Sequence, residues 1–173
     1  MAVQVKARIV DKGIRKRQAF VAEMTKYRGA FTEVGIFEDA KDDDGDTVAD
    51  YANKHEFGID VPKRPFMRRT FNKHRKEWEA FLGKRQLEIM KGKETVKGAL
   101  FKLGLIAHTN TKKMIRTGEW GELAKGPYRD EKERMNKNKV LINTGTMHNS
   151  ITFQVRIGKK TTKATESQTK GKV

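Results

Sequence analysis

The sequence contains no cysteine among its 173 residues. Disulfide bonds and thiolate metal sites are therefore excluded. No run of about 18 apolar residues is present, so we expect no transmembrane helix and no membrane partner. The first ten residues also lack the continuous apolar segment of a signal peptide. We therefore expect the protein to be made in the cytoplasm.

Motifs that supply an activated catalytic group are missing as well. The sequence has no phosphate-binding Gly-rich loop, no His-Glu-x-x-His pair and no nucleophile elbow. A trio of Ser150, His148 and an aspartate can be assembled, but any chain of this size offers such a trio. We therefore expect no enzymatic activity and no cofactor.

An acidic loop at residues 38–46 invites a calcium interpretation, but the spacing does not fit. The EF-hand pattern places glycine at position six and glutamate at position twelve. With Gly45 at position six, position one is Ala40 and position twelve is Tyr51. We expect a solvated loop or an acidic contact for a basic neighbour, and no metal site.

Basic residues outnumber acidic residues by 38 to 22, which gives a net charge of +16. Such an excess predicts attraction to a polyanion, which could be nucleic acid or an acidic protein surface. Apolar residues make up only 36% of the chain and charged residues 35%. A chain of this composition has a very polar surface, has disordered ends or completes its core against another subunit.

Hydrophobic periodicity predicts an α+β fold with a small, mostly antiparallel sheet and helices packed on one face. Alternating apolar residues predict strands at 3–9, 31–37 and 151–157. Helical patterns are expected at 11–28, 48–54, from Pro65 to a break near Gly92, and from Thr95 to about Met114. We interpret residues 1–157 as one domain.

Two further segments lack a clear apolar pattern. Residues 117–139 carry Trp120 and Tyr128 among glycines and charges, which predicts a long loop or an arm that reaches a neighbouring subunit, with a disordered connector as the alternative. Residues 158–173 are rich in lysine, serine and threonine, and they predict a flexible basic tail. Residues 144–148 are expected to form a turn into the last strand.

The segment at residues 51–71 combines a helical turn, a Glu56-Phe57-Gly58 corner, two prolines and the start of the longest helix. Pro62 and Pro65 bias the residues before them toward extended conformations, and Pro65 suits the first position of a helix. The segment therefore predicts a rigid corner that leads into a helix.

The helix after this corner has two distinct faces. Apolar and aromatic side chains recur at spacings of four and three residues, which predicts a buried stripe of Met67, Phe71, His74, Trp78 and Phe81. The opposite face is basic. It predicts contact with phosphate or with an acidic partner, through Arg68, Arg69, Lys73, Arg75 and Lys76.

Two stretches together resemble a known family. The corner at 51–71, preceded by Val34-Gly-Ile-Phe37, and the later stretch Val140-Leu-Ile-Asn-Thr-Gly-Thr-Met-His-Asn-Ser-Ile-Thr-Phe153 resemble the tailed-phage virion morphogenesis proteins, which complete the tail at the neck. The resemblance covers about residues 31–157 in the family's order. It does not extend to the acidic insert at 41–46 or to the lysine-rich C-terminus.

The resemblance implies a structural virion protein that forms a homo-oligomeric ring at the head–tail junction and joins the tail to the DNA-filled head. We expect a hexamer, with a dodecamer as the alternative, and partners among the connector or adaptor, the tail terminator and the tail tube. Packaged DNA is a further candidate contact. The expected interface residues are Phe57, Pro62, Arg64, Pro65, Phe66, Trp120, Tyr128, Thr144, Gly145 and Met147.

Two alternatives stay open. The protein could instead be a tail terminator or head–tail adaptor of the same junction, since these proteins share its size and fold type. It could also be a basic nucleic-acid-binding protein that uses the basic helix face, although no helix-turn-helix spacing or zinc site supports that interpretation.

Overall fold

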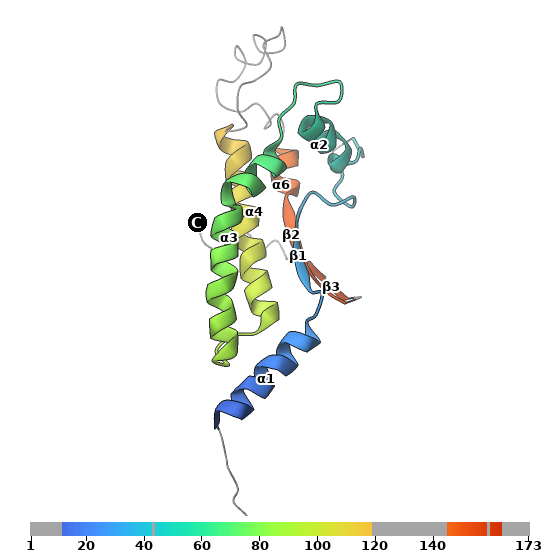
Figure 1. The fold of residues 1–173 in the computed structure, drawn as a ribbon. Coiled ribbons are helices and arrows are strands. Elements are labelled where there is room, and N and C mark those ends of the chain that lie inside the picture. Colours follow the sequence, from blue (N-terminus) through green and yellow to red (C-terminus); the bar gives the residue numbers. More distant parts are fainter. Residues whose placement is uncertain (1–11, 43, 119–144, 159, 164–173) are drawn as a thin grey trace, which may run out of the picture.

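A computed structural model describes residues 12–42, 44–118, 145–158 and 160–163, and it has the expected α+β architecture (Figure 1). The predicted strand at 3–9 and most of the predicted arm at 117–139 lie outside the described residues. The elements are α1 (Lys12–Lys26), β1 (Phe31–Gly35), α2 (Val48–Phe57), α3 (Phe66–Met90), α4 (Val96–Thr117), α6 (Thr146–Ser150), β2 (Thr152–Ile157) and β3 (Lys160–Lys163).

The described sheet is antiparallel, and its strand order is β1-β2-β3. β1 and β2 lie far apart in sequence, and their register places Val34 opposite Phe153. The third strand corrects an expectation. Residues 160–163, predicted to begin a flexible tail, instead pair with β2 across a turn at Gly158, whose φ is +58°. The sequence pattern missed this strand because its side chains are polar and mostly exposed, so they produce no apolar alternation.

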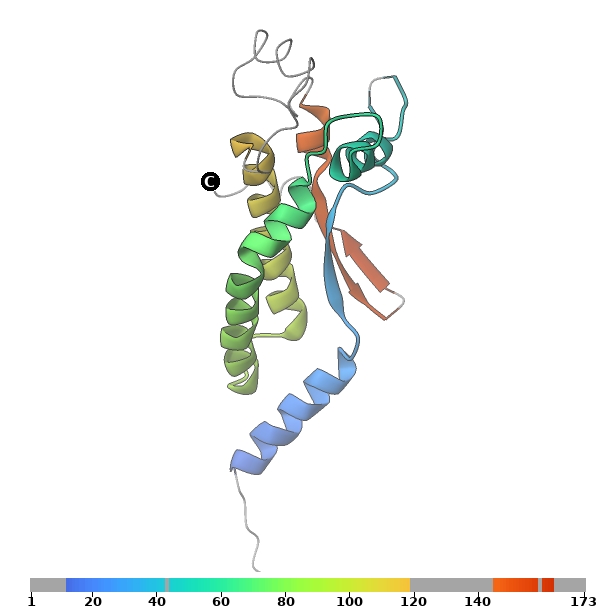
Figure 2. The ribbon, with the colours of Figure 1, turned by 45° about the horizontal axis from the view of Figure 1, so that its top comes forward.

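The two long helices, α3 and α4, lie on one side of the sheet in two successive layers (Figure 2). α4 packs against both β1 and β2, and α3 packs against α4. Both long helices thus lie on one face of the sheet, as predicted, with α4 against the strands and most of α3 in an outer layer. The start of α3 approaches β1, where a methyl group on Gly35 would lie 3.8 Å from Cε of Met67. α1 runs away from the start of β1 and contacts the body beside the turn that joins α3 to α4 (Figure 1).

α4 approaches the sheet closely because its inner face carries small residues. Gly104 and Ala107 are buried, and the ring of Phe153 fills the space above Gly104. A methyl group added at Gly104 would lie 2.2 Å from Cδ2 of Phe153. Phe101 contacts the same ring edge-to-face, with centroids 5.0 Å apart. The contact between α4 and β2 therefore depends on the absence of a side chain at residue 104.

A second group of buried side chains lies where α2, the start of α3, the end of α4 and α6 meet. It brings together residues that are far apart in sequence, and its side chains are almost fully excluded from solvent. This group connects the corner to the sheet. Its members are Val48, Ala52, Phe66, Met114, Ile115, Met147 and Ile151.

The observed boundaries of the predicted helices and of the predicted strands that the structure describes lie within about three residues of the predictions. α3 ends before Gly92, whose φ is +71°, and Thr95 caps α4 by accepting from the Gly98 amide at 3.1 Å. Pro65 is the residue before the first helical residue of α3, one position earlier than expected. The turn expected at 144–148 is instead α6, a short helix that begins after the left-handed Gly145, although Thr144 itself is outside the described residues.

We predict that Gly104→Ala lowers the free energy of unfolding by about 1–3 kcal/mol, because the new methyl group forces the Phe153 ring out of its position. Chemical denaturation followed by circular dichroism measures this change. Gly83→Ala in α3 is the matched control, since a methyl group there meets no atom within 4 Å. The control should gain up to about 1 kcal/mol from helix propensity. Equal effects of the two substitutions would contradict the close packing of Gly104 against the Phe153 ring.

Candidate functional site

The corner between α2 and α3 is built around the carboxylate of Glu56, which is 8% exposed. Its Oε2 accepts from the Met67 amide at 2.9 Å, and its Oε1 accepts from the Arg68 amide at 3.0 Å. These amides belong to the first turn of α3, where backbone N–H groups lack partners within the helix. Pro65 cannot cap this turn with its own side chain, so the last turn of α2 supplies the cap.

The other amides of this first turn also have partners. The Phe66 amide donates to the Arg64 carbonyl at 2.8 Å, and the Arg69 amide donates to the Pro65 carbonyl at 2.9 Å. A negative carboxylate at this end also interacts favourably with the helix dipole. All four backbone N–H groups of the first turn of α3 therefore donate hydrogen bonds to residues of the corner.

The chain between α2 and α3 makes a tight return. Gly58 ends α2 with φ of +78°, and a methyl group on it would lie 2.9 Å from Cβ of Lys63. The Arg64 amide donates to the His55 carbonyl at 2.7 Å, and the guanidinium Nη1 of Arg64 donates to His55 Nδ1 at 3.2 Å. Burial lowers the pKa of Arg64 from its ordinary value.

The structure separates the predicted interface residues into distinct groups. Arg64, Phe66 and Met147 are buried within the chain, so their side chains hold the corner and α6 in place. Phe57 is 54% exposed and available to a partner. Pro62, Pro65 and Gly145 are partly buried. Trp120, Tyr128 and Thr144 lie outside the described residues.

The predicted basic face of α3 is a continuous exposed surface beside the corner. Its five residues, Arg68, Arg69, Lys73, Arg75 and Lys76, are all exposed. The Arg68 guanidinium lies over the Phe57 ring, 5.5 Å from its centroid. Arg75 forms an exposed ion pair with Glu79 at 3.6 Å. The corner and the basic face therefore form one surface, in which an exposed aromatic ring lies next to cationic side chains.

The predicted apolar stripe of α3 is only partly buried. Met67, His74, Trp78 and Phe81 face inward with intermediate exposure, whereas Phe71 is half exposed. His74 stacks on Trp78 with ring centroids 6.1 Å apart, and its Nδ1 lies 2.9 Å from Oε2 of Glu77. The arrangement agrees with the predicted packing role of His74. Among the described residues, no group of three or more histidines and carboxylates could hold a metal ion.

The acidic loop makes local contacts in its described part. Oδ1 of Asp42 accepts from the amides of Asp44 and Asp46, at 3.2 and 2.8 Å. Nζ of Lys41 donates to Oγ1 of Thr47 at 2.7 Å. Asp39, at the start of the loop, pairs with Lys163 of β3, and this hydrogen bond lowers the pKa of Asp39. The loop thus connects α2 to the far edge of the sheet.

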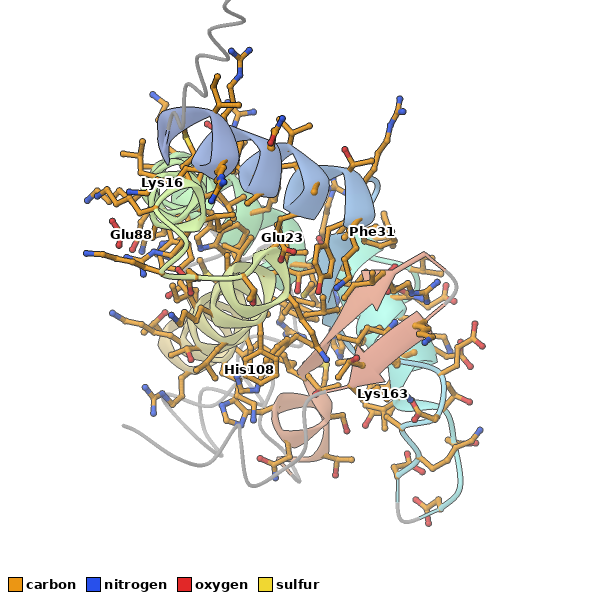
Figure 3. All side chains as sticks on the ribbon, turned by 90° about the horizontal axis from the view of Figure 1, so that it is seen from below. Lys16, Glu23, Phe31, Glu88, His108 and Lys163 are labelled. Atoms are coloured by element: carbon orange, nitrogen blue, oxygen red, sulfur yellow. The ribbon has the colours of Figure 1, made fainter. Side chains whose placement is uncertain are left out.

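Sequence reasoning did not single out two residues that the structure places at key positions. Val48, Ala52 and Glu56 recur at spacings of four residues, which places them on one face of α2. That spacing could have indicated that Glu56 is buried. His108, labelled in Figure 3, is buried on α4 beside Phe153, with ring centroids 6.2 Å apart. Within the described part of the chain, neither of its ring nitrogens has a well-aligned hydrogen-bond partner. Burial, reinforced by the nearby charges of Lys112 and His148, lowers the pKa of His108 to about 4.

Large apolar side chains remain exposed over much of the described surface. Phe57 and Ile59 project from the corner, and others lie along α1 and the outer side of α3. No described helix is long and apolar enough to cross a membrane. The exposed group consists of Ile14, Val21, Met24, Phe31, Phe57, Ile59, Phe71, Leu82, Leu87 and Met90.

We predict that Glu56→Gln lowers the free energy of unfolding by about 2 kcal/mol, because two charge-assisted hydrogen bonds to α3 are weakened in a buried position. Urea denaturation measures the loss. Glu79→Gln is the matched control, since Glu79 is an exposed residue of α3 whose ion pair should contribute less than about 1 kcal/mol. If both variants lose the same small amount, the cap does not hold the corner.

We also predict that stability falls as the pH decreases below neutrality. The pKa of His108 is about 4 in the folded chain and about 6.5 when unfolded, so the unfolded state binds more protons in this range. Its contribution is complete above about pH 7 and should decrease by about 2 kcal/mol by pH 5. Denaturation at pH 7 and pH 5 measures this. The His108→Leu variant should lose less stability between pH 7 and pH 5. An equal loss in the variant and the natural protein would show that His108 does not cause the pH dependence.

No protein-family model, no curated protein and no solved structure matches this chain. Its function must therefore be argued from the corner, the basic face and the exposed apolar side chains.

Proposed function

We propose that this chain is a structural virion protein of a tailed bacteriophage. In this proposal it completes the tail at the neck, as a homo-oligomeric ring that joins the tail to the DNA-filled head. The subunits form a hexamer, with a dodecamer as the alternative. The partners of the ring are neighbouring virion proteins, which are the connector or adaptor, the tail terminator or the tail tube, and it has no catalytic role.

The observation that carries the proposal is the packing of the two family-like stretches against each other. Ala52 and Phe66 come from the stretch at 51–71, and Met147 and Ile151 come from the stretch at 140–153. These four side chains share one buried cluster, and α2 contacts α6 directly. Two short matches that are far apart in sequence thus form one structural unit. That is expected if they are parts of a single family signature.

The distribution of apolar side chains also supports an assembly role. In the described part of the chain, Leu87, Phe57 and Val21 are each more than half exposed. Exposed apolar groups spread over α1, the corner and α3 are typical of surfaces that are covered by other subunits. In a closed ring, each subunit contacts one neighbour on each side, through two different surfaces.

The basic face of α3 has a role both in a ring protein and in a nucleic-acid-binding protein. In a ring it meets an acidic partner surface or the DNA that passes through, and such charge complementarity favours specific and rapid association. The exposure of all five basic residues is also the observation that favours the second candidate, a nucleic-acid-binding protein.

The test is the mass of the purified protein in solution at low and moderate salt, with and without duplex DNA. We expect a discrete hexamer or dodecamer whose mass does not change with DNA. A monomer that binds DNA, with affinity falling steeply as salt rises, would contradict the proposal and favour the nucleic-acid interpretation.

A charge-reversal variant separates the two interpretations further. Arg68→Glu combined with Lys76→Glu should leave the ring mass unchanged if the protein contacts hold the ring. If DNA binding is the function, the same variant should weaken binding to all sequences and reduce the salt slope by about 2. Lys93→Glu combined with Lys97→Glu, which changes the charge equally near the start of α4, is the matched control.

A further inference from the structure

The outer edge of β1 is an unprotected sheet edge in the described structure. β1 pairs with β2 on one side only, and all five of its residues are at least partly exposed. The opposite edge, β3, begins and ends with lysine, a residue that discourages further strand pairing. β1 contains neither lysine nor proline. Its edge can therefore accept another strand.

The sequence offers one segment with the pattern that this edge requires. Residues 3–9 alternate apolar Val3, Val5, Ala7 and Ile9 with polar residues. The sheet likewise has one apolar face and one polar face. Phe153 and Val155 are buried beneath α4, while Glu33 and Arg156 form an ion pair at 2.8 Å on the other face. A strand from residues 3–9 would continue both faces of the sheet.

The whole length of α1 separates this segment from β1 of its own chain. α1 has 15 residues and therefore extends about 22 Å, and it runs away from the start of β1 (Figure 1). Only Val10 and Asp11 separate residues 3–9 from α1. A returning strand of seven residues spans about 23 Å, which brings it back to the start of β1 but not along it.

α1 is held in this direction by its own contacts. Figure 3 labels Glu23 on the side of α1 that faces the body, and its Oε1 accepts from the Val96 amide at 3.4 Å. Lys16, Ala19 and Phe20 line the groove against the turn between α3 and α4. The other side of α1 leaves Ile14, Val21 and Met24 exposed. The first residue of α1 therefore lies away from β1, and the apolar side of α1 is one that a neighbouring subunit would cover.

We propose that residues 3–9 add as a fourth strand to the β1 edge of a second copy of this chain. The inference rests on the proposed ring, because it specifies how adjacent subunits are joined. Each subunit donates its N-terminal strand to one neighbour and accepts a strand from the other. Such a head-to-tail contact produces a ring when the rotation between subunits closes.

Engineered disulfides test this directly, because the natural chain has no cysteine. Phe31→Cys is placed in one protein, and Gln4→Cys, Lys6→Cys or Arg8→Cys in another, so that the three partners cover neighbouring registers on one face. After mild oxidation of the mixed full-length proteins, we expect a disulfide-linked dimer of the two chains in at least one mixture. Val5→Cys, on the opposite face, is the matched control and should give little cross-linking.

The outcomes distinguish this inference from the proposed function. A ring of normal mass with no cross-link in any mixture would overturn strand exchange and leave the ring. A monomer with no cross-link would overturn both. Placing Phe31→Cys and Lys6→Cys in one chain adds a second readout, since an intrachain disulfide alone would mean that the strand pairs within its own subunit, contrary to the inference.

A proline variant gives an independent measurement. Val5→Pro combined with Ala7→Pro should block strand addition, because proline cannot donate to the sheet and fits poorly in its interior. The mass in solution should fall toward the monomer, while the helical circular dichroism signal stays unchanged. Val5→Ala combined with Ala7→Ser should keep the assembled mass. An unchanged mass for the proline variant would overturn the inference.

Discussion

The carboxylate of Glu56 is the interaction on which the corner depends. It joins the last turn of α2 to the first turn of α3, and it satisfies the Met67 and Arg68 amides that Pro65 cannot cap. The same turn directs the exposed Phe57 ring toward Arg68. A single buried charge thus sets the direction of the longest helix and the composition of the surface beside it. The exposed surface beside the corner thus depends on the hydrogen bonds that the backbone of α3 requires.

The contact between α4 and the sheet is the second constraint, and it acts through the absence of a side chain. Gly104 lets the Phe153 ring lie against the helix backbone, which brings small residues of α4 over β1 and β2. The opposite face of the sheet is polar, with Glu33 accepting from Gln154 and pairing with Arg156. The sheet therefore needs helices on one face only, and its β1 edge remains available.

These constraints produce a chain whose described part is well specified internally and yet leaves large apolar groups in solvent. Glu56 caps the start of α3, Thr95 caps the start of α4, and β1 pairs with the distant β2 in a defined register. The apolar side of α1, the Phe57 ring and Leu87 are not covered. This combination fits the proposed assembly, in which each fold forms before neighbouring subunits cover its apolar groups. In that proposal, the basic surface of α3 would add long-range attraction to the shorter-range apolar contacts.

The sequence by itself determined the α+β class, the two strands that carry apolar alternation, the ends of the long helices and the basic face of α3. Periodicity and glycine positions are local signals, so they can be read without knowing the fold. Only the tertiary structure decided that Arg64, Phe66 and Met147 are buried and Phe57 is exposed, since burial depends on which distant residues meet. It also decided that Glu56 caps α3, that Gly104 admits Phe153, and that the polar residues 160–163 form a strand. Each of these depends on a partner from another element, and no local pattern identifies that partner.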